Sequence, residues 1–568
     1  MTSVSPCLSE IDPTRSIWDH WQRHADRAPE REAIIHLTLG EEPTRWRWGG
    51  LVEAASRVAA ILSDSGVKKG DVCALIVRHD ERFYPLYMGV SFLGALPAVL
   101  AYPNSRLHPD KFRQGLEGMS RRSGLDHILT ERDLSEIVAP LVGGRDSTVR
   151  SVIHPLEAMS RPGAAAARAP VQSDEASLLQ HSSGTTGLQK PVVLSHRAVL
   201  AHIRRYGAAL EVTPDDRVVS WLPLYHDMGL IAAFYLPLIC AIPSVQLSPM
   251  EWVASPVLLL QAISRERGTL CWLPNFAYNL MADRVRDEDL EGVRLDSVRL
   301  IVNCSEPIRA DSHDRFHRRF APLGLRRATL GTCYAMAETT FAVTQTPPGG
   351  EARRLGVDRV ELSKGNVLPV PEPEATRVCV SSGPPVSGCT VRIVDGDRRD
   401  LPAGKVGEIA ISSVSLFDGY RHYPEKTAEV LQDGWFHSGD LGFVHDGECY
   451  VIGRSKDLII IAGNNVFPED VEDAAGQVPG ILPGRVAAFG AEDERLGTEV
   501  LCVVAETALA SEQDRKAARV AILRAGMAID LTISRVYLVP PRWLIKSSSG
   551  KPAREANKAR ALSEVAWR

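Results

Sequence analysis

The sequence lacks the cysteine patterns that are typical of structural metal sites and of disulfide-bonded proteins from oxidising compartments. Its ten cysteines include no C-x-x-C pair, and none clusters with histidine at the spacing of a metal site. This pattern excludes a cysteine-based zinc site and a disulfide-rich scaffold. Most of the cysteines stand among apolar residues, where a thiol behaves as a small hydrophobic side chain. We therefore expect a reduced, cytoplasmic protein.

Long hydrophobic runs and an excess of positive charge are also missing. One of the most apolar stretches, Leu230–Pro243, is interrupted by Pro237 and is shorter than the roughly 18–20 residues that a membrane span requires. Met1–Ser16 lacks the basic start and apolar centre of a signal peptide. The net charge is -5, and the arginines are scattered among acidic residues. The expectation is no membrane span and no nucleic-acid binding.

The length of 568 residues is too great for one hydrophobic core, so at least two domains are expected. Through the first 340 residues, short apolar runs such as Val72–Val77 and Arg299–Val302 alternate with helical patterns such as Ser255–Arg265. This alternation favours α/β layers. After about residue 375 the runs become short and β-like, as in Val391–Asp397 and Gly407–Ile411. A final segment, which starts near residue 454, mixes strands with helices.

One loop stands out because it is built for binding rather than packing. His181–Lys190 (HSSGTTGLQK) holds two glycines, four hydroxyl side chains and a lysine in ten residues. Glycines let backbone N–H groups approach a phosphate, hydroxyls donate to its oxygens and lysine adds charge. The spacing does not match the Walker A loop. By itself, a solvent-exposed Ser/Thr/Gly turn explains the stretch equally well.

Further stretches give this loop a context. In chain order they are Trp221–Gly229 (WLPLYHDMG), Asn303–Pro307 (NCSEP), Cys333–Thr339 (CYAMAET), Trp435–Gly442 (WFHSGDLG), Gly453–Asp457 (GRSKD) and Ser547–Lys551 (SSSGK). With the loop, this set resembles the adenylate-forming (ANL) superfamily over nearly the whole chain from about residue 30. The resemblance implies an α/β fold, with a large N-terminal domain of layered α/β subdomains plus a β-barrel-like subdomain. It also implies a small mobile α+β C-terminal domain, so the domains are predicted at residues 1–453 and 454–568.

The resemblance also implies ATP and Mg²⁺ as cofactors and assigns roles to residues. Predicted catalytic residues are Lys551, Lys190 and Glu338, and predicted Mg²⁺ ligands are Thr185 and Glu338. Predicted nucleotide-binding residues are Ser183, Gly184, Thr185, Thr186, Gly187, Ser305, Glu306, Pro307, Cys333, Tyr334, Ala335, Met336, Asp440 and Arg454. Predicted substrate-binding residues are His226, Asp227, Asn275 and Phe276.

Several of these roles have a plainer alternative in the residues alone. Asp440 stands in a glycine-bracketed turn and is expected to accept hydrogen bonds from the ribose, whereas an ordinary turn aspartate would look the same. Arg454 is expected near the ribose and phosphate, whereas the residue by itself could equally be an arginine on the solvated surface. Lys551 is expected to swing in and stabilise charge as pyrophosphate leaves, although a terminal lysine is usually just solvated. Glu338 near a triphosphate suits Mg²⁺, with a surface helix-start acid as its alternative.

Within the superfamily the chain looks like the fatty acyl-AMP ligase branch. The stretches that carry this are Trp221–Leu230, Pro274–Tyr278 (PNFAY), Ser305–Arg309 (SEPIR) and Leu458–Asp470 (LIIIAGNNVFPED). Glu351–Pro385 resembles the extra insertion of that branch, which is expected to hold the mobile domain away from a CoA-using arrangement. Members of the branch pass the acyl group to the phosphopantetheine arm of an acyl carrier protein.

The acid itself is not named by the sequence. Trp272, Phe276 and Met336 are candidate pocket walls or plain core residues, and Trp221 or Trp272 is large enough to shorten the pocket. Pro191 follows Lys190 where the usual loop has glycine, so a stiffer loop exit is expected. The leading hypothesis is adenylation of a carboxylic acid, expected to be fatty, with transfer to a carrier protein. CoA-ester formation, activation of a small oxyacid such as nitrite, and an inactive adenylate-binding scaffold stay open, although intact Lys190, Glu338, Asp440 and Lys551 argue against the scaffold.

Overall fold

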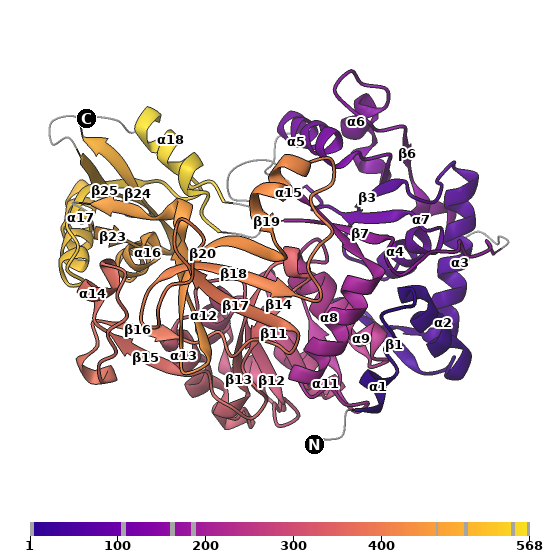
Figure 1. Cartoon of the computed structure of the whole chain (residues 1–568), viewed down its shortest axis with the longest axis horizontal. Helices are drawn as coiled ribbons and strands as arrows, with labels where there is room; N and C mark the ends of the chain where they lie inside the picture. Colours follow the sequence, from indigo (N-terminus) through magenta and orange to yellow (C-terminus); the bar gives the residue numbers. More distant parts are fainter. Residues whose placement is uncertain are drawn as a thin grey trace.

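The computed structural model describes residues 5–103, 109–159, 165–182, 189–461, 464–493, 498–546 and 551–564. Figure 1 shows helices packed around several sheets, with the C-terminal elements gathered at one end of the molecule. The helices of eight or more residues, one of them (η3) a π-helix, are α2 Ile17–Arg27, α3 Trp48–Asp64, α4 Phe83–Phe92, α5 Pro109–Ser123, α8 His196–Ala209, η3 Met228–Tyr235, α11 Val257–Glu266, α12 Asn275–Arg284, α13 Ala310–Phe320, α16 Pro468–Gly476, α17 Glu512–Met527 and α18 Arg554–Glu564.

The largest sheet has eight strands, of which the central six are parallel and the two edge strands antiparallel. In spatial order its strands are β14 Ala342–Gln345, β13 Leu330–Ala335, β12 Leu300–Asn303, β11 Leu270–Leu273, β9 Val218–Ser220, β10 Ser244–Leu247, β1 Glu32–Leu37 and β2 Thr44–Arg47. The parallel strands are short apolar runs with buried side chains, as expected when helices cover a parallel sheet. The mixed α/β class predicted from the alternation of runs is confirmed.

A second sheet is fully parallel, in the order β4 Leu96–Val99, β3 Val72–Ile76, β5 His127–Thr130 and β6 Ser151–Ile153. The side chains of strand β3 show that this sheet is covered on both faces. Val72, Ala74 and Ile76 belong to one core cluster, while Cys73 and Leu75 belong to the other. Alternate side chains of a strand point to opposite faces, so both faces of the sheet are buried.

Antiparallel strands make up the next part of the chain. They are the pair β7 Ala176–His181 and β8 Pro191–Ser195, the pair β15 Arg354–Val357 and β16 Arg377–Val380, and a five-stranded sheet of β17 Cys389–Val394, β18 Gly407–Ser413, β19 Leu431–Gln432, β20 Trp435–His445 and β21 Glu448–Arg454. The β-rich texture predicted after residue 375 corresponds to this five-stranded sheet. Pro191 is the first residue of β8, a position where the missing N–H of proline is tolerated.

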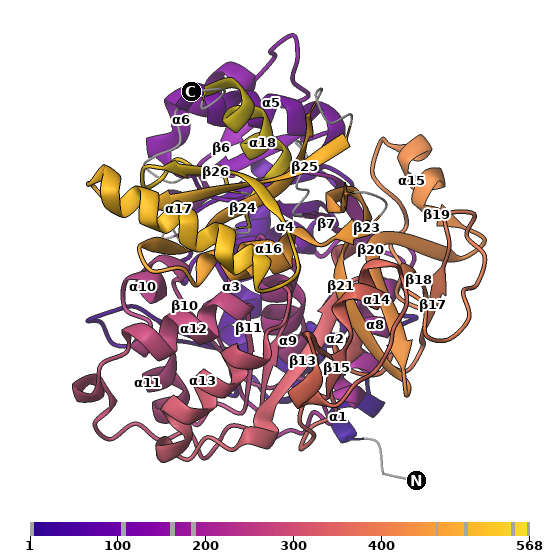
Figure 2. The ribbon, with the colours of Figure 1, turned by 90° about the vertical axis from the view of Figure 1, so that its left-hand side faces the viewer.

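The C-terminal elements have cores of their own. They are the pair β22 Ile459–Ile461 and β23 Asn464–Val466, and the sheet β24 Ile481–Asp493, β25 Thr498–Thr507 and β26 Ile533–Val539. One cluster of buried residues packs this sheet against α16 and α17, and a second packs its other face against α18. Figure 2 shows α16 and α17 stacked beside the strands. The boundary at residue 454 stays a prediction.

The apolar stretch at residues 230–243 is buried inside the protein. It forms the π-helix η3 and the following helix α9 Leu236–Ile239, and all of their residues are buried. Among the described residues, no helix is both long enough and apolar enough to cross a membrane.

Candidate active site

Two neighbouring parallel strands deliver the central motifs of the site. β12 and β13 pair in register from Ile301 with Leu330, so their carboxyl ends lie side by side. Ser305, Glu306 and Pro307 follow β12, while Met336 and Glu338 follow β13. Loops at the carboxyl ends of parallel strands are where α/β folds bind ligands.

The backbone is strained at the same edge. Ser305 has a φ of 70°, and Thr340, just after Glu338, has a φ of 69°. Residues other than glycine seldom adopt this left-handed region, and strained residues cluster at binding sites. Glu306 faces α12, because its Oε2 accepts a hydrogen bond from the backbone N of Phe276 at 2.8 Å. Burial raises the pKa of Glu306.

Asp440 and Arg454 face each other across the β20–β21 ladder. Arg454 Nε lies 2.9 Å from Asp440 Oδ1, and the Tyr334 hydroxyl donates to Asp440 Oδ2 at 2.6 Å. The neighbouring Asp440 carboxylate raises the pKa of Arg454. The predicted nucleotide residues from three motifs therefore form one cluster.

The prediction that Asp440 stands in a turn is wrong, because Asp440 lies inside the eleven-residue strand β20. The glycines around it serve a different purpose. Gly439 has a φ of 70°, and the register of β20 with β18 shifts between His437 and Leu441, the part of the strand that contains Gly439 and Asp440. A bulge of this kind bends a strand and re-aims a side chain without ending the ladder.

Lys551 reaches this cluster from the far end of the chain. The charges of Arg454, Glu306 and Asp440 all act on its ammonium group, and burial lowers its pKa. Arg554, three residues later, is bound by Asp457 at 2.7 Å, Glu469 at 2.8 Å and Glu472 at 2.8 Å. This clamp fixes the start of α18 and with it the position of Lys551.

Lys190 and Glu338 meet through a third residue, Tyr420. The Tyr420 hydroxyl donates to Glu338 Oε1 at 2.7 Å, and Lys190 Nζ lies 3.4 Å from the same hydroxyl. Glu338 is only 9% exposed, so the surface-acid alternative does not hold. Burial lowers the pKa of Lys190.

No group of three or more His, Cys, Asp or Glu side chains suited to a metal occurs in the part of the chain that the structure describes. A single buried carboxylate nevertheless fits Mg²⁺, which is usually held by one or two carboxylates together with substrate phosphates. Five residues predicted from the loop lie outside the described residues, as do the first four residues of the Ser547–Lys551 motif. The five are Ser183, Gly184, Thr185, Thr186 and Gly187.

Cys333, Tyr334 and Ala335 end β13 beneath the cluster. Cys333 is 2% exposed, and its thiol lies 3.5 Å from the backbone oxygen of Tyr334. The backbone N of Met336 donates to Phe341 O at 2.9 Å. These contacts hold the end of β13 in place.

The predicted acid-binding residues lie at the starts of two helices: His226 and Asp227 directly precede η3, and Asn275 and Phe276 begin α12. His226 Nδ1 is 3.7 Å from Asp227 Oδ1, and Asp227 also accepts from the backbone N of Met228 at 2.8 Å, at the start of η3. Asn275 is engaged by the protein: it donates to Ser312, and its Oδ1 accepts from Asn303 Nδ2 and from the backbone N of Arg309. Asn275 thus fixes the ends of β12 and α12.

Phe276, next along α12, is 40% exposed and belongs to an aromatic group. Trp221 stacks on Trp252 with ring centroids 3.6 Å apart, and Phe276 meets both rings edge-on at 6.2 Å. Trp252 belongs to the short helix α10 Pro249–Ala254. The group is joined to the nucleotide side through the hydrogen bond from Phe276 to Glu306.

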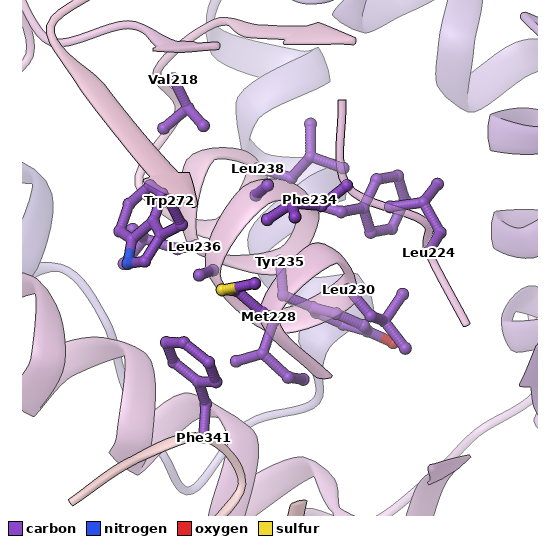
Figure 3. Packing of buried hydrophobic residues seen from close by; sticks show 14 of the residues in the cluster. Val218, Leu224, Met228, Leu230, Phe234, Tyr235, Leu236, Leu238, Trp272 and Phe341 are labelled. Atoms are coloured by element: carbon purple, nitrogen blue, oxygen red, sulfur yellow. The ribbon is translucent and has the colours of Figure 1, made fainter. Parts of the chain in front are cut away.

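Trp272 is placed differently, deep in the core. It is fully buried, and its indole N–H donates to the Tyr206 hydroxyl at 2.8 Å. Figure 3 shows Met228 between Trp272 and Phe341, beside the turns of η3. Trp272 is therefore a core residue behind the site, whereas Trp221 and Phe276 lie at its edge.

The segment 351–385 contacts the C-terminal part of the chain through charges. Asp470, which is 8% exposed, lies 3.2 Å from Arg359 Nη1 and 3.1 Å from Arg377 Nη1. Arg309 adds a hydrogen bond to the backbone oxygen of Glu469 at 2.9 Å. Arg359 begins the short helix α14 Arg359–Ser363, and Arg377 begins β16.

Sequence reasoning missed Tyr420, Arg554 and Asp470. Each acts across a long sequence separation, and each belongs to a residue type that is common on surfaces. The one local signal at Tyr420 is the preceding Gly419, whose φ of 118° marks a special backbone position.

Comparison with known proteins gives this geometry a family. The family model described as AMP-binding enzyme matches residues 21–421. A provisionally named acyl-CoA synthetase of Caulobacter vibrioides is 32% identical, with 97% of this chain and 98% of that protein covered. The chain belongs to the AMP-binding enzyme family.

Two further relatives define the neighbourhood within this family. A 4-hydroxyphenylalkanoate adenylyltransferase of Mycobacterium tuberculosis is 29% identical, with 96% of this chain and 92% of that protein covered. A solved structure from a study of fatty acyl-adenylate ligases of E. coli and L. pneumophila has a TM-score of 0.88 and 28% identity, and covers 97% of this chain and 98% of that one. The AMP-binding enzyme described here is an AMP-forming ligase that uses ATP.

Proposed function

We propose that this AMP-binding enzyme joins a fatty acid to AMP and passes the acyl group to the phosphopantetheine thiol of a carrier protein. The observations that carry the proposal are two groups of side chains that meet from distant segments: Asp440 with Arg454 and Tyr334, and Glu338 with Tyr420 and Lys190. Chain segments 82 to 230 residues apart thereby supply cations and acceptors to the predicted nucleotide site. The likeness to fatty acyl-adenylate ligases supports the class of acid.

In the first half-reaction, a carboxylate oxygen of the acid attacks the α-phosphorus of ATP. The bond from that phosphorus to the bridging oxygen breaks, and pyrophosphate leaves with the electron pair. Lys551 is assigned to the carboxylate and α-phosphate oxygens, where its charge opposes the negative charge that accumulates. Lys190 is assigned to the departing phosphates.

Asp440 is assigned to the ribose hydroxyls. A carboxylate offers about four acceptor positions, and Tyr334 and Arg454 occupy one on each oxygen. The remaining positions are free to accept from a nucleotide. Mg²⁺, which Glu338 would hold, supplies positive charge to the phosphates when bound. Glu306 and the aromatic group border the side on which the acid lies.

In the second half-reaction, a thiol sulfur attacks the acyl carbon, the bond to AMP breaks and the thiol proton is released. The ion pairs between Asp470 and the arginines of segment 351–385 support a carrier protein as the acceptor. They join segment 351–385 to the C-terminal part of the chain, and thus oppose the rearrangement expected of CoA ligases.

An aryl-substituted acid is the second candidate substrate. The stack of Trp221 on Trp252, faced by Phe276, offers flat apolar surfaces that suit an aromatic ring. The 4-hydroxyphenylalkanoate adenylyltransferase among the relatives points the same way.

The test is a two-stage assay on the full chain. ATP and Mg²⁺ are incubated with alkanoic acids of increasing length, with phenylalkanoic acids and with nitrite, and acyl-AMP is measured by mass spectrometry. A holo carrier protein or CoA is then added, and thioester formation is followed. Acyl-AMP from alkanoic acids with transfer to the carrier alone is the expected result; no adenylate from any acid would contradict the proposal.

A further inference from the structure

A short backbone segment, residues 417–421, joins the two halves of the predicted phosphate site. Its hydrogen bonds run to β8, just past Lys190, and to the backbone of Glu338. They are Val193 N to Gly419 O at 3.0 Å, Asp418 N to Val193 O at 3.0 Å, Arg421 N to Pro191 O at 2.9 Å and Phe417 N to Glu338 O at 2.8 Å. The segment is therefore fixed to both of the elements that carry Lys190 and Glu338.

The side chain of Tyr420 makes the same connection at the level of charge. Tyr420 is 4% exposed, and its backbone N donates to Thr427 Oγ1 at 2.9 Å. The single phenolic hydrogen is donated to Glu338 Oε1 at 2.7 Å. Lys190 Nζ approaches the phenol from the other side, 3.4 Å from its oxygen and 4.9 Å from the ring centroid.

This arrangement keeps Lys190 and Glu338 from neutralising each other. No direct ion pair joins them among the described residues, although Glu338 is buried and Lys190 is half-buried. A lysine and a glutamate in direct contact would satisfy each other and would have to be separated before either could meet a phosphate or a cation. Instead, the phenol of Tyr420 donates a hydrogen bond to one oxygen of Glu338, and its ring face makes a cation–π contact with the ammonium group of Lys190.

The hydrogen bond also makes the two oxygens of Glu338 different. Oε1 is held by Tyr420, whereas Oε2 has no hydrogen-bond partner within the described part of the chain. We propose that Tyr420 is a positioning residue, which orients Glu338 so that Oε2 is presented to the divalent cation of ATP and holds Lys190 ready for the phosphates. The proposal rests on the roles of Glu338 and Lys190 in the proposed function.

The test separates this role from simple packing. In Tyr420→Phe the ring keeps its contact with Phe417, 4.9 Å between centroids, and loses only the hydroxyl. Tyr423→Phe is the matched control, because Tyr423 is 37% exposed. ATP affinity is measured by calorimetry with and without Mg²⁺, and the thermal midpoint is recorded for each variant.

The ratio of ATP affinity with Mg²⁺ to ATP affinity without Mg²⁺ is the Mg²⁺ gain. We expect this ratio to be about tenfold or more lower in Tyr420→Phe than in the wild type, since a hydrogen bond to a charged group is worth about 1.5–3 kcal/mol. Mg²⁺-free ATP affinity is expected to change by less than about threefold. Tyr423→Phe is expected to match the wild type. Lys190→Met provides a second variant, in which the Tyr420–Glu338 bond is intact and the gain on adding Mg²⁺ is expected to persist.

Three results would overturn the proposal: an unchanged Mg²⁺ gain in Tyr420→Phe, an equal loss with and without Mg²⁺, or a loss of the gain in Lys190→Met. A wild type that binds ATP identically with and without Mg²⁺, and forms no adenylate, would overturn the proposed function as well. A wild type with a clear Mg²⁺ gain beside an unaffected Tyr420→Phe would overturn the role of Tyr420 alone.

Discussion

Arg454 Nε lies 2.9 Å from Asp440 Oδ1, and Tyr334 holds the other oxygen of the same carboxylate. The assigned role of Asp440 at the ribose predicts a specific defect in Asp440→Ala. The KM for ATP should rise about tenfold or more, and the preference for ATP over 3′-deoxy-ATP should disappear, since the acceptor for that hydroxyl is gone. Steady-state kinetics with both nucleotides measure this, with the exposed Asp446→Ala as control. A variant that still discriminates fully between the two nucleotides would remove Asp440 from the ribose.

The pH dependence of adenylation should report Lys551. Burial lowers the pKa of this lysine, and the positive Arg454 acts in the same direction. A lysine with a lowered pKa loses its charge at a lower pH than an ordinary lysine, so kcat/KM should decline on the alkaline side below the usual lysine range near 10.4. Lys551→Arg should move that decline to higher pH. An alkaline limb unchanged in Lys551→Arg would assign it to another group.

Asp470 should contribute strongly to stability, because buried charge is costly to leave unpaired. Asp470→Asn removes the carboxylate between Arg359 and Arg377, which predicts a loss of about 3–5 kcal/mol in the free energy of unfolding. Asp473→Asn is the matched control: its side chain is 49% exposed and lies 3.8 Å from Arg309. A surface pair of that kind is worth about 0–1 kcal/mol. Denaturant unfolding measures the free energy of unfolding of both variants. Equal losses in Asp470→Asn and Asp473→Asn would show that the ion pairs of Asp470 contribute no more than a surface pair.

Two tryptophans should respond differently to the same substitution. Trp272→Ala empties a fully buried position and removes the hydrogen bond to Tyr206, so the free energy of unfolding should fall by about 3–5 kcal/mol. The preference among acids should stay the same. Trp221→Ala lies at the edge of the site and should change which acids are adenylated, toward bulkier ones. Acid panels and thermal unfolding on both variants separate the effects. An unaltered acid preference in Trp221→Ala would exclude that residue from the pocket wall.

The parts of the fold that the sequence could predict are those with a local cause. Short apolar runs such as Val72–Val77 became buried parallel strands, since a strand covered on both faces must be apolar throughout. Glu306 and Glu338 follow two adjacent parallel strands, β12 and β13. Asp440 was predicted in a turn, since glycines on both sides resemble one. Only the ladder with β18 shows that Gly439 lies in an irregular part of a continuous strand.

The parts that the sequence could not predict depend on distant partners. Tyr420 is 230 residues from Lys190 and 82 from Glu338, and apart from the preceding Gly419 no neighbouring residue in the sequence distinguishes it. Asp470 meets arginines from three separate segments, a relationship that only the packed chain reveals.

Pyrophosphate exchange into ATP, followed across the acid panel in the wild type and in Lys551→Ala, measures directly whether the chain adenylates an acid with the help of Lys551. We expect acid-dependent exchange in the wild type, strongest with fatty acids, and a loss of about 100-fold or more in Lys551→Ala, the scale seen when one stabilising group is removed from a developing charge. Exchange at the wild-type rate in Lys551→Ala, or no exchange with any acid in the wild type, would contradict this expectation.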